Sequence, residues 1–439
     1  MVPCLELVAT TETESGPLRI MYSTGCLSDP ELTPTQLWLW NQETQKSVAV
    51  PLPKDARGPR PSSDMSLVLF RRAVDDLHQE LWVIDSNGSN ERKMAAIALD
   101  EIQGRYPTAN SIGLEYGWVQ DTHLVFYETR PLLDLELSPF DAVVLIGAAS
   151  GDAVSVIPSG EVIALRYSPD GAQIAAQTPS EVRLIDASNG RVQSIAPIAW
   201  NSGVENPLQY SPYGRFLTVL TYQGVAIVDT ATGNYQETLL EYLLWGAGDW
   251  YLYMPPFHWR DPNTVLMLVA PPFEVDGQPL DVFAELLDWE FAVYSLDASE
   301  LTTSIVQSFR GIYPSAKLSP DSNHLAYERA IRDSETRELY VADLTQATQA
   351  LYAAGDQLSL IGWAPDSRRF FFAVSEDRKS SVYLGQLGQD PLPFDVRPGS
   401  ITWLDQEHIV AKPASSELEL HVYTVGGEDT LIVAIQRSE

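Results

Sequence analysis

The stretch Leu165-Arg-Tyr-Ser-Pro-Asp-Gly171 decides the fold of this chain. Proline fixes φ near −65° at the first corner of a turn, and an aspartate side chain accepts hydrogen bonds from the amides that follow it. Glycine then adopts the positive φ that a β-carbon disfavours. A short apolar run follows at once, from Ile174 to Gln177. The stretch therefore predicts a tight turn between two short β-strands.

The same pattern recurs along the chain at intervals of roughly 40 to 60 residues, a period typical of four-stranded units. Helical periodicity is nearly absent between the copies. The clear copies are Leu208-Gln-Tyr-Ser-Pro-Tyr-Gly214, Lys317-Leu-Ser-Pro-Asp-Ser322 and Gly362-Trp-Ala-Pro-Asp-Ser367. Weaker copies are Arg60-Pro-Ser-Ser-Asp64, Trp118-Val-Gln-Asp121, Trp259-Arg-Asp-Pro262 and Trp403-Leu-Asp405.

A second recurring turn opens where an apolar strand ends at an aspartate. Examples are Arg183-Leu-Ile-Asp186-Ala-Ser-Asn-Gly190 and Ala226-Ile-Val-Asp229-Thr-Ala-Thr-Gly233. Because an aspartate recurs at the same position of several repeats, we interpret these aspartates as turn-forming residues and not as catalytic ones. The predicted structural turn residues are Asp170, Gly171, Asp186, Asp229, Asp321 and Asp366.

Together the two turns resemble those of the TolB-type and WD-repeat β-propeller families, over about residues 18 to 435. The resemblance implies an all-β fold, a single propeller of four-stranded antiparallel blades. It says little about chemistry, because one fold carries many functions. The chain departs from the family pattern in lacking the Gly-His and Trp-Asp signatures of the best-known WD-repeats.

The number of blades depends on how the N-terminal strands are used. We divide the chain into an N-terminal segment, residues 1–17, and a propeller domain, residues 18–439. Eight blades are favoured, while seven and nine stay open. The N-terminal strands either form a separate blade with Leu5 to Ala9 as its inner strand, or share a blade with the C-terminus to seal the exposed sheet edges.

Composition excludes several classes of function. The 439 residues carry 28 Lys+Arg against 59 Asp+Glu, a formal net charge of −31, which repels nucleic acids and anionic lipid surfaces. With 45% hydrophobic and only 20% charged residues, the chain is expected to fold around a large core. No apolar run approaches the roughly 18 to 20 residues of a membrane span, so we predict no membrane insertion.

Two cysteines, Cys4 and Cys26, both lie near the N-terminus. Such a pair could form a disulfide that holds a loose end, which requires an oxidising compartment. Two free thiols remain the alternative. On this basis an extracytoplasmic location is favoured and a cytoplasmic one stays open, as does the oligomeric state.

Long loops on one face of the predicted propeller are rich in aromatic residues. Large aromatic rings with a polar handle suit carbohydrate stacking or a protein hot spot, although about half of them are expected to pack under the loops. The predicted binding residues are Trp245, Trp250, Tyr251, Tyr253, Phe283 and Trp289. Trp259, at an inner-strand position, is expected in the core.

Carboxylates on the same loops are the remaining chemical candidates. Two carboxyls roughly 5 to 10 Å apart could hydrolyse a glycosidic bond, and a cluster of oxygens could hold Ca²⁺. We expect no other cofactor. The candidate acids are Asp249, Asp276, Glu285 and Asp288. A solvated acidic surface explains most of them equally well.

Sequence motifs for catalysis are missing. The chain contains no Gly-x-Ser-x-Gly, P-loop, His-Glu-x-x-His or Cys-x-x-Cys pattern. We therefore predict a non-catalytic binding or scaffold protein that recognises a protein or glycan partner through its loops. The first alternative is a carbohydrate-active enzyme that uses loop carboxylates at the channel mouth. The second is a cytosolic WD-repeat-like assembly platform.

Overall fold

The computed structural model of the chain is built almost entirely from β-strands. It describes residues 5–11, 18–24, 36–106, 109, 111–119, 124–132, 142–157, 162–199, 208–221, 224–239, 245–246, 252–253, 257–270, 289–331, 334, 336–376, 379–425 and 429–434. Among these residues, no helix has the length and apolar character that crossing a bilayer requires.

The chain folds as two compact units. The first comprises Met1–Leu217, Val228–Tyr235 and Ile432–Glu439, and the second comprises Thr218–Ile227 and Gln236–Leu431.

Sheets of four strands make up most of both units. Those up to residue 239 are β1 to β4 (Leu5–Thr10, Arg19–Thr24, Gln36–Asn41, Lys46–Val50), β5 to β8 (Arg57–Pro61, Leu67–Ala73, His78–Asp85, Arg92–Ala98), β9 to β12 (Ser111–Trp118, Leu124–Leu132, Ala142–Gly147, Ala153–Ile157), β13 to β16 (Ala164–Tyr167, Gln173–Gln177, Val182–Asp186, Val192–Ala196) and β17 to β20 (Leu208–Tyr210, Phe216–Leu220, Gly224–Asp229, Tyr235–Leu239).

The later sheets follow the same plan with one variation. They are the pair β21 and β22 (Trp245–Gly246, Leu252–Tyr253), β23 to β29 (Phe257–Trp259, Thr264–Val269, Trp289–Asp297, Thr303–Leu318, His324–Ala330, Thr336–Asp343, Thr348–Asp356), β30 to β33 (Ser359–Trp363, Arg369–Glu376, Lys379–Gln386, Leu392–Phe394) and β34 to β37 (Thr402–Trp403, His408–Ala411, Glu419–Thr424, Asp429–Ala434). The long strand β26 pairs with both β25 and β27, which joins two repeats into one seven-stranded sheet.

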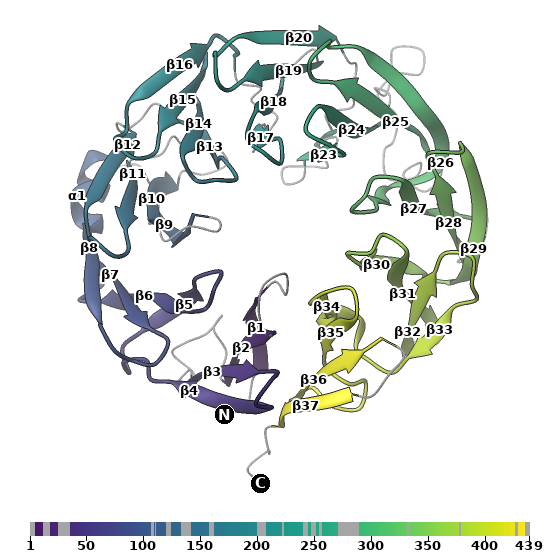
Figure 1. Cartoon of the computed structure of the whole chain (residues 1–439), viewed down its shortest axis with the longest axis horizontal. Coiled ribbons are helices and arrows are strands. Elements are labelled where there is room, and N and C mark those ends of the chain that lie inside the picture. The colour runs from purple at the N-terminus through teal and green to yellow at the C-terminus, as the bar shows by residue number, and fades with distance from the viewer. Residues whose placement is uncertain are drawn as a thin grey trace. The chain divides into compact units, whose positions relative to one another are not determined.

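Every sheet is an antiparallel meander in which neighbours in sequence are neighbours in space, as Figure 1 shows for β13 to β16. The predicted all-β architecture of four-stranded antiparallel sheets is confirmed. The favoured number of eight is not confirmed, because the described residues form seven four-stranded sheets and one seven-stranded sheet besides the β21–β22 pair. Leu5–Thr10 is the first strand of a sheet of its own with β2, β3 and β4. The boundary at residue 17 stays a prediction.

A buried serine organises the turn between the first and second strands. The Ser168 hydroxyl donates to Asp170 Oδ1 at 2.6 Å and accepts from the Gln173 amide at 2.9 Å. The Ser168 amide donates to the Gln173 carbonyl, and the Gly171 amide donates to the Ser168 carbonyl. One hydroxyl thus ties the end of β13, the turn and the start of β14 together.

The same bonds recur in the other copies. Buried serines at 62, 211 and 319 accept a hydrogen bond from the amide five residues later, and those at 62 and 319 also donate to the turn aspartate. The residue three places after each serine has positive φ: Gly171 and Gly214 meet this requirement without strain, whereas Met65 and Ser322 adopt it as larger residues. The turn geometry is therefore set by the repeat and not by glycine alone.

Apolar residues on facing sheets form the cores. Between β9–β12 and β13–β16, Val143 and Leu145 pack in one cluster with Ile174 and Ile185, all nearly inaccessible to solvent. Burying each such side chain contributes about 1.5 to 3 kcal/mol relative to leaving it exposed. The helix α1 (Leu99–Arg105) links β8 to β9 and buries Ile102 in the preceding core. Trp259 is buried, as predicted.

Aromatic residues just before the turns reach back to the preceding sheet. The Trp118 indole donates to the Arg60 carbonyl at 2.9 Å, and the Trp363 indole donates to the Lys317 carbonyl at 2.9 Å. In both cases the bond joins the first strand of one repeat to a strand of the preceding sheet. This position is the one that Tyr167 occupies in its own repeat.

Replacing Ser168 by Ala is expected to lower the free energy of unfolding by about 1 to 3 kcal/mol, because the Gln173 amide and Asp170 lose a buried partner. Denaturant unfolding followed by tryptophan fluorescence measures the change. Ser188→Ala is the matched control: Ser188 also donates to an aspartate, but it is exposed, and its loss is expected to stay within about 0.5 kcal/mol. Equal effects of the two substitutions would contradict the role given to the buried hydroxyl.

Candidate functional site

Most residues of the predicted loop site lie outside the described residues. This holds for Trp250, Tyr251 and Phe283, for all four candidate acids (Asp249, Asp276, Glu285 and Asp288), and for Cys4 and Cys26. Trp245 and Tyr253 are paired across the short strands β21 and β22. Trp289 begins β25 opposite Gly311, so its backbone belongs to a sheet and not to a loop.

The turn aspartates hold their own turns. Asp186 Oδ1 accepts from the amide and the hydroxyl of Ser188, and Asp229 Oδ1 accepts from the amides of Ala231 and Thr232. In the later repeats Asp321 accepts from Ser319, while Asp366 pairs with Arg369 at 2.6 Å. The bond from Ser168 holds the pKa of Asp170 below its usual range, and the bonds from Ser188 do the same for the pKa of Asp186. Asp170 and Asp186 therefore stay charged at neutral pH.

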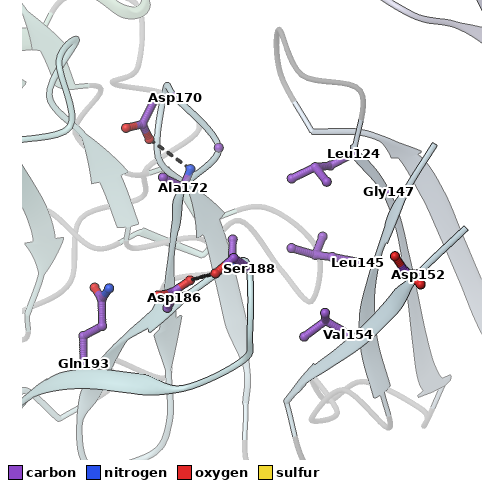
Figure 2. Close-up of a pocket in the computed structure, with 12 residues that line it drawn as sticks. Leu124, Leu145, Gly147, Asp152, Val154, Asp170, Ala172, Asp186, Ser188 and Gln193 are labelled. Atoms are coloured by element: carbon purple, nitrogen blue, oxygen red, sulfur yellow. Dashed lines mark hydrogen bonds between the residues drawn. The ribbon is translucent and has the colours of Figure 1, made fainter. Parts of the chain in front are cut away.

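A hollow of about 560 Å³ lies beside two of these turns, between β9–β12 and β13–β16. Figure 2 shows an apolar wall formed by Leu124, Leu145 and Val154 facing a polar wall. The polar wall carries Asp170, Asp186, Ser188 and Gln193. The hollow lies beside the Ser-Pro-Asp-Gly turn that contains Asp170 and Gly171.

The unusual titratable group of this region is Glu128, in the middle of β10. Its partner across the strand pair is Glu115 on β9, so the two carboxyl side chains leave the same face of the sheet. From the next sheet, the Tyr167 hydroxyl donates to Glu128 Oε1 at 3.0 Å. The Tyr167 ring is anchored by Phe126, at 5.5 Å between ring centroids.

Burial dominates the electrostatics of Glu128. Removal from water raises the pKa of Glu128 to about 7, and the nearby charge of Glu115 raises it further, while the Tyr167 bond, Arg130 and Arg166 oppose the rise. Burial and the Glu128 charge also raise the pKa of Tyr167, so the phenol stays neutral and remains a donor. Glu128 is thus a carboxyl that exchanges its proton near neutral pH.

Two arginines near this carboxyl are fixed by backbone carbonyls of the same unit. Arg130 Nη2 donates to the Ile163 carbonyl at 2.8 Å, and Arg166 Nε donates to the Leu208 carbonyl at 3.2 Å. Glu115 is exposed on β9, the edge strand of its sheet.

Metal binding finds no support in the part of the chain that the structure describes, where no three His, Cys, Asp or Glu side chains gather. The predicted Ca²⁺ site depends on loop acids outside that part, and it stays a prediction.

The sequence analysis did not single out Glu128. The signal was present, since Leu124-Val-Phe-Tyr-Glu128 places one carboxyl in an otherwise apolar strand. The partners that give this carboxyl its pKa come from another strand and another sheet, which a single strand cannot reveal.

Comparisons with known proteins relate the fold to β-propeller proteins. No protein-family model and no curated protein matches the sequence. Among solved structures, the chain is similar to Porphyromonas gingivalis dipeptidyl peptidase 4, with 12% identity and a TM-score of 0.51, over 85% of this chain and 59% of that one. It is also similar to an oligogalacturonate lyase in complex with manganese, with 12% identity and a TM-score of 0.39, over 88% of this chain and 97% of that one. A third similar structure is the β-propeller domain of the Trilobed protease from Pyrococcus furiosus, with 12% identity and a TM-score of 0.37, over 98% of this chain and 96% of that one.

These neighbours are β-propeller proteins, and none of them singles out the TolB-type or WD-repeat families. At 12% identity the likeness shows the fold alone. The expectation of a non-catalytic binding or scaffold protein is contradicted, because the similar structure with a TM-score above 0.5 is that of an enzyme, a dipeptidyl peptidase.

The raised pKa of Glu128 makes stability depend on pH. Between the ordinary carboxyl pKa of 4.5 and about 7, the folded chain binds a proton that the unfolded chain releases, so this group's contribution to the free energy of unfolding falls as pH rises through that window. Glu128→Gln removes the charge. The melting temperature of this variant relative to the wild type is therefore expected to rise between pH 5 and pH 8, by the equivalent of at most about 3 kcal/mol.

Glu43→Gln, an exposed carboxyl on the β3–β4 turn, is the control and is expected to follow the wild-type profile. Melting profiles of the wild type and Glu128→Gln that run parallel over this range would show that Glu128 titrates normally.

Proposed function

We propose that the protein is a carbohydrate-active enzyme that cleaves glycosidic bonds, with Glu128 and Glu115 as its catalytic carboxyl pair. The observation that carries the proposal is the half-buried Glu128 carboxyl, whose pKa is raised to about 7, directly across the strand pair from an exposed glutamate. The loop carboxylates predicted from the sequence are replaced in this role by residues of two adjacent strands.

Glutamates at directly opposite positions can bring their carboxyl groups within the separation that hydrolysis with retention needs. Side chains directly opposite on antiparallel strands have β-carbons about 4.5 to 5.5 Å apart. Retaining glycosidases place their two carboxyl groups about 5 to 5.5 Å apart. Two carboxyls in different surroundings, one half-buried and one exposed, also match the division into a proton donor and a nucleophile.

In the proposed reaction, protonated Glu128 gives its proton to the glycosidic oxygen as the bond from that oxygen to the anomeric carbon breaks. The Glu115 carboxylate attacks the anomeric carbon and forms a glycosyl ester. Ionised Glu128 then takes a proton from water, whose oxygen displaces Glu115 from the anomeric carbon. Tyr167 orients Glu128 Oε1 through the 3.0 Å bond and stays neutral throughout.

A carbohydrate substrate fits these groups better than a peptide. The peptidase elbow Gly-x-Ser-x-Gly does not occur in the sequence, and the carboxyl pair has no nucleophilic Ser or Cys beside it among the described contacts. The oligogalacturonate lyase among the structural neighbours acts on a sugar polymer, which agrees in class only. Location outside the cytoplasm stays part of the proposal.

Hydrolysis of soluble and polymeric glycans, followed by release of reducing ends, tests the proposal. Glu128→Gln is expected to lower kcat by about 10² to 10⁴ while the fold is kept, because the amide cannot donate the proton from the same acid. Glu115→Gln is expected to lose activity to a similar extent. The wild-type rate is expected to fall above pH 7 as Glu128 ionises.

Glu43→Gln should keep full activity and serves as the control for a surface carboxyl. Tyr167→Phe is informative because it removes only the hydroxyl: it is expected to shift the alkaline limb of the pH profile upward, since the bond from Tyr167 opposes the rise in the pKa of Glu128. Activity of Glu128→Gln within twofold of the wild type would refute the assignment, and so would a wild type inactive on every glycan tested.

A further inference from the structure

One turn of the repeat breaks its own pattern. In Ser-Pro-Tyr-Gly, Tyr213 stands where the other Ser-Pro turns have Asp170 or Asp321. The backbone of the turn is unchanged, because Ser211 still accepts from the Phe216 amide at 3.0 Å and Gly214 has φ of +71°. The turn therefore forms without the aspartate, and its geometry gives no reason for a tyrosine.

The Tyr213 side chain is 80% exposed, the highest value among the large apolar side chains of the described residues. Instead of packing into a core, it lines a hollow of about 450 Å³. Volumes of 300 to 1,000 Å³ are usual for small-molecule sites. The ring is thus presented to solvent at the rim of a space large enough for one or two sugar rings.

Most of the remaining lining side chains are polar, and Asp170 is the one charged side chain among the lining residues that the structure describes. Asp170, Gln193 and Thr232 come from three different segments and share the hollow with Tyr213. Ser194, which also lines it, has a buried hydroxyl with no hydrogen-bond partner among the described residues.

The hydrogen bonds that position these groups leave capacity for a ligand. Asp170 uses Oδ1 for its turn, and a carboxylate has a second oxygen that can accept. Gln193 Oε1 accepts from Gln173 Nε2 at 2.7 Å, which fixes the amide against the wall. Gln173 is itself held by the Tyr210 hydroxyl, so the wall is ordered before any ligand arrives.

We propose that Tyr213 and its hollow form a binding site for a neutral oligosaccharide, in which a sugar ring stacks on Tyr213 and its hydroxyls bond to Asp170, Gln193 and Thr232. An aromatic ring offers an apolar face to the C–H groups of a sugar, while acids and amides bond to the hydroxyls. The inference goes beyond the proposed catalytic pair and shares with it only the class of ligand.

Charge selects among ligands. The lining contains no Lys or Arg, Asp170 stays ionised at neutral pH, and the whole chain has a net charge of −31. Phosphates, nucleotides and uronic acid chains are therefore repelled. A protein partner would be expected to bind a largely apolar patch, whereas most side chains that line this hollow are polar. Neutral sugars remain as the ligands that match both the ring and the hydroxyl-binding groups.

The test uses the full chain carrying Glu128→Gln, so that bound sugars are not turned over. The probes are cellohexaose, xylohexaose, mannohexaose and maltohexaose, with trigalacturonate as the anionic probe and spermidine as the cationic one. Binding is measured by isothermal titration calorimetry and by saturation-transfer NMR. At least one neutral probe is expected to bind, and trigalacturonate is expected to bind at least tenfold more weakly.

Tyr213→Asp is the decisive variant, because it restores the Ser-Pro-Asp-Gly turn found elsewhere in the chain. Its melting temperature is expected to equal or exceed that of the parent, while the Kd of the neutral probe rises at least tenfold. Tyr213→Phe keeps the ring and is expected to bind within threefold of the parent. Val48→Ala, which alters an exposed apolar residue on β4, should change nothing.

Binding that is unaffected by Tyr213→Asp overturns the inference, and so does binding of spermidine alone or of no neutral probe. The outcome is separable from that of the proposed function. Tyr213-dependent binding in a protein without hydrolytic activity would refute the catalytic proposal alone, whereas hydrolysis with binding indifferent to Tyr213 would refute this one alone.

Discussion

The fold depends on a serine hydroxyl that is buried at the end of the first strand of a repeat. In the repeat of Ser168 this hydroxyl donates to the turn aspartate and accepts from the first amide of the second strand. A buried amide without a partner costs about 1 to 3 kcal/mol, so the bond fixes where the second strand must begin. Side chains alternate along a strand, so fixing that start also fixes which residues face the core. In the repeat of Ala364, which lacks the hydroxyl, Asp366 accepts directly from the Arg369 amide and pairs with its guanidinium instead.

Because the register is fixed, equivalent positions in different repeats can be compared directly. The fifth residue of the second strand is Glu128 in one repeat, Gln177 in the next and Glu328 in a later one. Glu328 is matched by Arg337 at 2.9 Å and by the Leu360 amide at 3.1 Å, and the Gln177 amide donates to the Ile198 carbonyl. Glu128 receives a neutral phenol at the same place. The Glu328 carboxylate forms a structural ion pair with Arg337, whereas burial raises the pKa of Glu128 to about 7 in spite of the bond from Tyr167.

This comparison separates what the sequence could predict from what it could not. The turns were predictable because their information is local: proline, aspartate and glycine act within four residues. The count of sheets was not, since β26 pairs on both sides and so belongs to two repeats at once. Glu128 and Glu328 each stand in an apolar strand after a tyrosine, and the sequence treats them alike. The two glutamates differ in their hydrogen-bond partners. Glu128 is bound by Tyr167, 39 residues away in sequence, and Glu328 is bound by Arg337 on a neighbouring strand. The chemistry of a site in this fold is therefore decided between strands and between sheets, where patterns along one strand carry no information.

Because the chain contains several copies of the same repeat, a copy that departs from the pattern can be compared with the others. Sequences that specify a fold well agree with it at every level, and natural proteins break such agreement mainly at functional sites. Glu128 gives up a cationic partner that Glu328 has, and Tyr213 gives up the carboxylate that Asp170 supplies to its turn. One exchange leaves a proton that can be transferred near pH 7, and the other leaves an aromatic ring in water beside hydroxyl-binding groups. Both departures fall within one compact unit, whose turns at Ser62 and Ser168 keep both the serine and the aspartate, so the departure at Tyr213 has unaltered copies in the same unit for comparison.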